Sequence, residues 1–195
     1  MDAKRLWHTL RLWTCRGAYT RGKYIREKHV FHKVGKRFSY QQRIIPLYPN
    51  LISVGDNVTI ASNVSFLTHD GIHTMLTNDE LIPSGHTKSE FQEGMGCIEI
   101  GNHVFIGAHS CISYNVRIGD NVVISAGSVV TNDIPSNSVV RGNPAKVICT
   151  LDQFLTMKLA KKGYPIELPH RMGHYVGEEL EAWLWNDFEE SRKKK

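Results

Sequence analysis

The sequence predicts an all-β solenoid, a chain wound into stacked three-sided coils, with helical extensions at both ends. Aliphatic residues recur every six positions from residue 100 to residue 130, and apolar residues have the same spacing at residues 54, 60 and 66. Small or turn-forming residues stand between them, and a single long segment after residue 69 breaks the period. A six-residue period fits neither an α-helix, which repeats about every 3.6 residues, nor a simple strand meander.

The repeat defines the inward positions of the coils. These positions hold large apolar side chains: Val54, Ile60, Phe66, Ile100, Ile106, Ile112, Ile118, Ile124 and Val130. Tight corners fall between them, where Gly, Asp and Asn tolerate turn conformations, as in Gly119-Asp120-Asn121. Three sides of six residues make a coil of eighteen, so stacked coils bury a continuous aliphatic column.

The flanking segments are predicted to cover the ends of the stack. Residues 1–33 form a basic helical extension with one amphipathic helix over residues 3 to 29, whose apolar face holds Leu6, Leu10 and Trp13. Residues 34–148 form the β-helix domain. Its first coil is imperfect and uses Val34, Phe38 and Tyr40.

Residues 149–195 form the second helical extension. Helices are expected near residues 151 to 161 and 178 to 190, joined by a linker around Pro165 and Pro169. Capping of the stack is the simplest interpretation of both extensions.

The net charge of +5 is concentrated near the N-terminus. Twelve of the 24 Lys and Arg residues lie between Lys4 and Arg43, where Glu27 is the only acidic residue. The simpler interpretation is a solvated helix face, while contact with a membrane surface stays open. The segment lacks the motifs of a nucleic-acid binder.

The four cysteines and the N-terminal sequence predict a cytoplasmic protein. No pair of cysteines has a metal-binding or redox spacing, so they are expected to be reduced thiols. His8 and Arg11 interrupt the apolar runs that a signal peptide would need. No stretch approaches the length that spans a bilayer.

The break in the period predicts an extruded loop over residues 70–97, without regular structure of its own. Long insertions in compact domains are uncommon and are usually functional. His69 stands directly before this loop, and its imidazole is a side chain that exchanges protons near neutral pH. Asp70 is a poor candidate for orienting it, since adjacent residues of an extended chain point to opposite faces.

Two motifs resemble the hexapeptide-repeat acetyltransferases, in particular the maltose, galactoside and capsular-polysaccharide O-acetyltransferases. The first is the run from Ile106-Gly107-Ala108-His109 to Ala126-Gly127-Ser128-Val129-Val130-Thr131. The second is Asp133-Ile134-Pro135 followed by Gly142-Asn143-Pro144-Ala145-Lys146. The resemblance covers roughly residues 50 to 148 and implies a left-handed parallel β-helix that assembles as a homotrimer, with active sites in the grooves between subunits.

The resemblance also implies the reaction and its residues. A histidine at the place of His69 would deprotonate a carbohydrate hydroxyl, which then attacks the thioester carbonyl of acetyl-CoA without a covalent enzyme intermediate. Acetyl-CoA would lie along residues with small or polar side chains and a terminal lysine: Ala108, Ala126, Thr131, Asn132 and Lys146. The family often carries cations at the places of Asn132 and Cys149, and Arg141 is available to compensate.

Other functions remain to be separated by experiment. The same scaffold supports N-acetylation of an amino sugar or sugar nucleotide, and a non-catalytic β-helix that serves as an assembly module is the alternative from another class. No metal is expected. His103 and His109 are six residues apart and therefore project from different sides of a coil, whereas β-helical carbonic anhydrases bind zinc with three histidines, two of which lie five apart.

Overall fold

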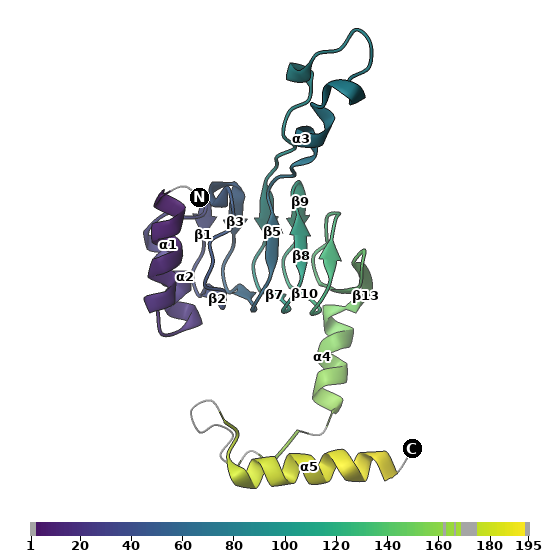
Figure 1. Ribbon diagram of the computed structural model, residues 1–195. Coiled ribbons are helices and arrows are strands. Elements are labelled where there is room, and N and C mark those ends of the chain that lie inside the picture. The colour runs from purple at the N-terminus through teal and green to yellow at the C-terminus, as the bar shows by residue number, and fades with distance from the viewer. Residues whose placement is uncertain (1–2, 162, 166, 169–174, 194–195) are drawn as a thin grey trace. The chain divides into compact units, whose positions relative to one another are not determined.

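The computed structural model describes residues 3–161, 163–165, 167–168 and 175–193 (Figure 1). The chain separates into two compact units, Met1–Phe154 and Leu155–Lys195. The first unit contains all the strands together with the helices α1 and α2. No helix in the described part of the chain is long and apolar enough to cross a membrane.

Three sheets of short strands run the length of the first unit. The first sheet contains β1 (Lys33–Val34), β3 (Ile52–Val54), β6 (Ile98–Ile100) and β9 (Val116–Ile118). The second sheet contains β2 (Ser39–Tyr40), β4 (Thr59–Ile60), β7 (Val104–Ile106), β10 (Val122–Ile124), β12 (Ser138–Arg141) and β13 (Lys146–Thr150). The third sheet contains β5 (Ser65–Leu67), β8 (Cys111–Ser113) and β11 (Val129–Val130). Neighbouring strands are parallel except β12 and β13. From β3 to β11 the chain visits the three sheets in the same order on each pass, as the predicted coils require.

The strand register confirms the eighteen-residue coil. Ile106 lies beside Ile124 and Ile112 beside Val130. Across the insertion the paired residues are forty-six positions apart, twenty-eight more than eighteen, as for Ile60 and Ile106. The predicted first coil also forms, because β1 and β2 pair with β3 and β4.

The predicted inward residues form the core. Ile100, Ile106, Ile112, Ile118, Ile124 and Val130 are between 0% and 2% exposed. The last residue of a corner has a left-handed backbone conformation, with φ of 55° at Asn57 and 58° at Asn121. His103 and His109 occupy equivalent corners at φ of 56° and 60°, so both are exposed turn residues.

The predicted single N-terminal helix is wrong. The chain forms α1 (Ala3–Thr14) and α2 (Ala18–Glu27), which lie at the β1 and β2 end of the stack (Figure 1). Gly17, in an extended conformation, begins α2 after the break, and the buried guanidinium of Arg21 donates to the carbonyls of Cys15, Tyr40 and Gln41. These bonds tie the turn between the helices to the first coil.

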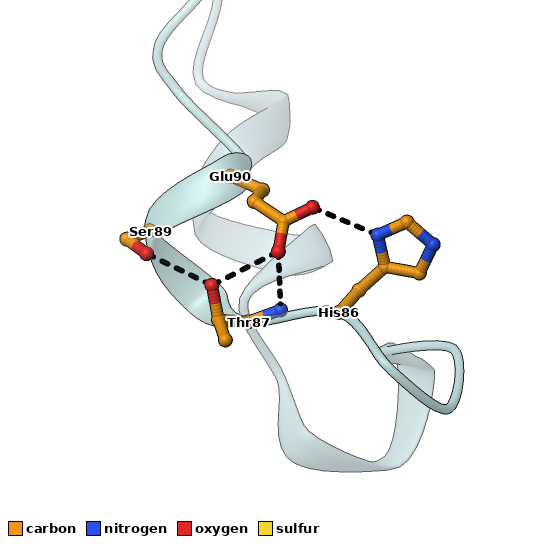
Figure 2. Close-up of polar contacts among 4 residues, drawn as sticks. All are labelled: His86, Thr87, Ser89 and Glu90. Atoms are coloured by element: carbon orange, nitrogen blue, oxygen red, sulfur yellow. Dashed lines mark hydrogen bonds and ion pairs between the residues drawn. The ribbon is translucent and has the colours of Figure 1, made fainter.

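The prediction that the insertion has no regular structure is wrong. It projects from the coils beside β5 and contains α3 (Ile72–Leu76) and the 3-10 turns η2 (Asp79–Leu81) and η3 (Lys88–Glu90) (Figure 1). A capping box begins η3, in which Glu90 accepts from the backbone N–H of Thr87 and also bonds the His86 ring at 2.8 Å (Figure 2). Local capping of this kind orders a segment that buries little surface.

The predicted C-terminal helices are confirmed as α4 (Leu151–Ala160) and α5 (Glu178–Lys193). Pro165, at the expected linker, is outside both helices, and Pro169 lies outside the described residues. In α5 the apolar side chains Leu184, Trp185 and Phe188 are between 40% and 60% exposed.

Candidate functional site

His69 lies where the last strand before the insertion gives way to the loop. Its backbone forms an antiparallel bridge with Met95, on the returning arm of the insertion. The backbone bonds of Asp70 to Gly94 and of Gly96 to Thr68 continue this ladder on both sides. His69 is therefore fixed at the base of the insertion by backbone bonds, although the insertion itself extends away from the coils.

One ring nitrogen of His69 has no hydrogen-bond partner in the described part of the chain. Its Nδ1 is buried and has no hydrogen-bond partner among the described residues. Its ring meets the ring of Tyr48 edge to face, with centroids 5.2 Å apart and an interplanar angle of 78°. The ring is thus held by packing, and its buried Nδ1 is left without a partner among the described residues.

Tyr48 was not identified from the sequence. It precedes η1 (Pro49–Leu51) with φ of 46°, a left-handed conformation that costs energy for an aromatic residue and clusters at functional sites. Its hydroxyl donates to Glu93 Oε2 at 3.2 Å, and this hydrogen bond, followed by the charge of Glu93, raises the pKa of Tyr48. Tyr48 precedes the block of coils that begins at Val54, and Glu93 lies in the insertion, so neither was among the residues that the motifs singled out.

Asp70 does not orient His69. One carboxylate oxygen accepts from the Tyr114 hydroxyl at 2.6 Å and the other from the backbone N–H of Ile72 at 3.1 Å. The bond from Tyr114, followed by that from Ile72, lowers the pKa of Asp70. The carboxylate thereby ties the start of the insertion to the turn after β8.

An open cavity of about 460 Å³ adjoins His69. Its polar lining residues include Arg5, Gln42, Asn63 and Ser65, and apolar side chains complete its walls. Gln42 Nε2 is buried without a partner among the described residues, as is Nδ1 of His69. Two buried polar atoms of cavity-lining residues therefore lack partners, and such atoms call for a ligand or water.

The residues predicted to bind CoA are distributed along the C-terminal half of the stack. Ala108 and Ala126 follow the paired residues Ile106 and Ile124 by two positions, so they occupy the same corner of neighbouring coils. The backbone N–H of Gly127 donates to the Ala108 carbonyl at 2.8 Å. Ala126 is exposed and Ala108 is partly exposed.

The remaining predicted CoA residues lie at the end of the stack. Thr131 and Asn132 are exposed and bond each other through their side chains at 3.0 Å. Lys146 begins β13 directly opposite Arg141 of β12, so two cations are neighbours there. Among the described residues, no hydrogen bond or ring contact joins His69 to any of the five predicted CoA residues.

Comparison with known proteins identifies the class of protein to which these sheets, this coil register and the histidine at the insertion belong. The model of the bacterial transferase hexapeptide family (six repeats) matches residues 97–132. Protein CapG of Staphylococcus aureus is 39% identical over 145 residues, which cover 74% of each chain. The chain belongs to the hexapeptide-repeat transferase family, as the sequence motifs indicated.

Two further relatives extend this result. The galactoside O-acetyltransferase of Escherichia coli (strain K12) is 38% identical over 117 residues, 59% of this chain and 52% of that protein. The chain thus spans about half the length of that curated relative. The crystal structure of a maltose O-acetyltransferase from Clostridium difficile 630 superposes with a TM-score of 0.51 at 29% identity, covering 75% of this chain and 86% of that one.

Proposed function

We propose that this protein transfers the acetyl group of acetyl-CoA to a carbohydrate hydroxyl, with His69 as the general base. Family membership supports acyl transfer, and the names of the galactoside and maltose O-acetyltransferases support a carbohydrate acceptor. The observation that carries the proposal is the buried, unpartnered Nδ1 of His69 beside an open cavity.

The chemistry needs one base and no covalent intermediate. His69 takes the proton of the acceptor hydroxyl while its oxygen attacks the thioester carbonyl, and the carbon–sulfur bond of the tetrahedral intermediate then breaks. The departing CoA thiolate receives the proton from the imidazolium. The base is restored, and the products are an acetyl ester and free CoA.

Tyr48 acts as a positioning residue for this base. Its ring contacts His69, and its hydroxyl is held by Glu93 from the returning arm of the insertion. The contact restricts the tilt of the imidazole, because an edge-to-face pair is favourable in only a narrow range of orientations. The insertion thereby helps to fix the base, although it is remote from the core.

The cavity of about 460 Å³ beside His69 is the proposed acceptor site. It combines the hydrogen-bonding groups of Arg5 and Gln42 with the apolar walls of Leu47 and Phe66. A saccharide presents hydroxyls at its edges and C–H groups on its ring faces, and it matches such a mixed surface. Gln42 Nε2 would donate to a ring hydroxyl.

The acetyl-CoA site is proposed along Ala108, Ala126, Thr131 and Asn132, with Lys146 at the nucleotide phosphates. The alanine corner leaves room for the pantetheine arm, since only methyl groups project there. Arg141 lies opposite Lys146 and adds a second cation, which offsets the absence of a lysine at Asn132.

The assembly is proposed to be a homotrimer of left-handed β-helices. Among the described residues no hydrogen bond or ring contact joins His69 to the proposed CoA residues, and in the proposed assembly a neighbouring subunit would bring the two halves of the site together. The insertion, which projects from its own coils, would contact that neighbour. A monomeric mass by light scattering would contradict the assembly. Use of acetyl-CoA and the free state of the described cysteines fit a cytoplasmic location.

The decisive experiment measures thiol release from acetyl-CoA with a panel of neutral saccharides and amino sugars. His69→Ala should lower kcat/KM by at least about 100-fold, the scale of a removed general base, with acetyl-CoA affinity nearly unchanged. His109→Ala is the control, since His109 is an exposed corner residue. Near-normal turnover by His69→Ala would sink the site assignment.

The same panel separates the alternatives. Release with amino sugars alone would favour N-acetylation. No release with any acceptor, and no acetyl-CoA binding by calorimetry, would favour a non-catalytic assembly module.

A further inference from the structure

The outward face of α1 carries an apolar stripe. Leu6, Trp7, Leu10 and Trp13 are between 40% and 63% exposed. At about 100° per residue, Leu6, Leu10 and Trp13 fall within about 60° of one another, with Trp7 beside them. The buried residues of the helix, His8 and Leu12, lie on the opposite face. The stripe therefore points away from the rest of the first unit.

The structure holds this face outward. Arg5 Nε donates to the Ile45 carbonyl at 2.9 Å, and the His8 ring bonds the Tyr24 hydroxyl of α2 at 2.8 Å. Leu12 is fully buried. These contacts fix the rotation of α1 about its own axis, so the stripe cannot turn into the core.

The charges around the stripe are positive. Helix α1 contains Lys4, Arg5 and Arg11 and no acidic residue. Arg43, from the segment after β2, places its guanidinium 5.2 Å from the centre of the Trp13 ring and donates to the Trp13 carbonyl. An apolar face of Leu and Trp bordered by Lys and Arg is typical of helices that lie in the interface of an anionic bilayer.

We propose that the outward face of α1 binds the surface of a bilayer that contains anionic lipid. The leucines and tryptophans would enter the boundary between headgroups and acyl chains, where amphipathic aromatic rings are favoured. Lys4, Arg11 and Arg43 would contact the phosphate groups. The helix lies on the bilayer and does not span it, since it has only twelve residues.

The second unit offers an internal comparison. Helix α5 also exposes apolar side chains, among them Leu184, Trp185 and Phe188, but its sixteen residues include six acidic and two basic side chains. An anionic bilayer repels such a helix. The two helices expose apolar side chains to a similar degree, but only α1 is predicted to bind anionic lipid, because its charged side chains are positive. This inference does not depend on the proposed acetyl transfer.

The test is flotation of the full chain with phosphatidylcholine vesicles and with equimolar phosphatidylcholine and phosphatidylglycerol vesicles. The protein should float with the anionic vesicles, less so at high salt, and not with the neutral ones. The double variant Trp7→Ser/Leu10→Ser should lower the bound fraction by about tenfold or more. The matched control Trp185→Ser/Phe188→Ser should bind like the wild type. Lys4→Gln and Arg11→Gln should each weaken binding about fivefold.

Three results would overturn the proposal. They are a wild-type protein that fails to float with anionic vesicles, equal flotation with both vesicle types, and a stripe variant that floats like the wild type. Light scattering tests whether a second copy of the chain binds this face instead of a bilayer. If the wild type ignores vesicles and the stripe variant loses mass, the face is a contact between copies of the chain, for which the acidic α5 of a second copy has complementary charge.

Discussion

The coil stack and the insertion between β5 and β6 are held in place by different forces. In the stack, each inward side chain packs against the equivalent residue of the next coil, as Ile112 does between Phe66 and Val130. The insertion has mostly exposed side chains and is held at its base by a short backbone ladder and the bonds of Asp70 and Glu93.

This difference separates stability from chemistry. A side chain that repeats along a column can be replaced only at the cost of packing, whereas a residue at the base of the insertion contributes little buried area. The proposed base and its positioning residues are found at that base. Substitutions in the stack should therefore change the free energy of unfolding, and substitutions at the base should change activity.

The largest effect on stability is expected for Ile112→Ala. The side chain is fully buried between two coils, so its removal leaves a cavity and should lower the free energy of unfolding by about 2–5 kcal/mol. Leu81→Ala, at an exposed site in the insertion, should change it by less than about 0.5 kcal/mol. Urea unfolding at one fixed protein concentration measures both. Equal losses would remove the distinction between the two regions.

A smaller energetic effect is expected at the alanine corner. Ala126→Trp should fill the proposed pantetheine path and weaken acetyl-CoA binding by at least about tenfold, while the folded assembly persists. Glu99→Trp, an equally bulky change at an exposed position of β6 in the first sheet, is the control. Calorimetry gives both affinities. Unchanged affinity in folded Ala126→Trp would show that the groove lies elsewhere.

The next prediction concerns Tyr48, whose ring packs against His69. Tyr48→Phe keeps the ring contact but removes the hydrogen bond to Glu93, and it should lower kcat about two- to tenfold with little change in KM for acetyl-CoA. Glu93→Gln retains a carbonyl oxygen that can accept from Tyr48, so it should stay near the wild type. A fall in stability without a fall in kcat would assign Tyr48 a structural role only.

The smallest effect is a change in acid stability. Hydrogen bonding lowers the pKa of Asp70 below its ordinary value of 3.8, so the stabilisation it provides is present above that value and is lost as the pH falls through the lowered pKa. Tyr114→Phe removes the first cause of this shift and should flatten the loss of stability in that acidic range. Unfolding measured against pH tests this, with Tyr19→Phe on α2 as the control. An unchanged profile would contradict the role of Tyr114.

The sequence by itself determined the coil stack. The six-residue period requires the same environment at every inward position, so Ile100 to Val130 could be placed in the core without coordinates. The family motifs and the position of His69 before the insertion were also readable, because both are tied to that period.

Only the tertiary structure decided how the ends and the site are built. Arg21 of α2 bonds carbonyls about twenty residues away, and no local pattern signals such bonds. Tyr48 and Glu93 are forty-five residues apart and meet because the insertion returns to its base. Contacts of this kind depend on where distant segments pack, whereas the period of the coils is repeated locally along the chain.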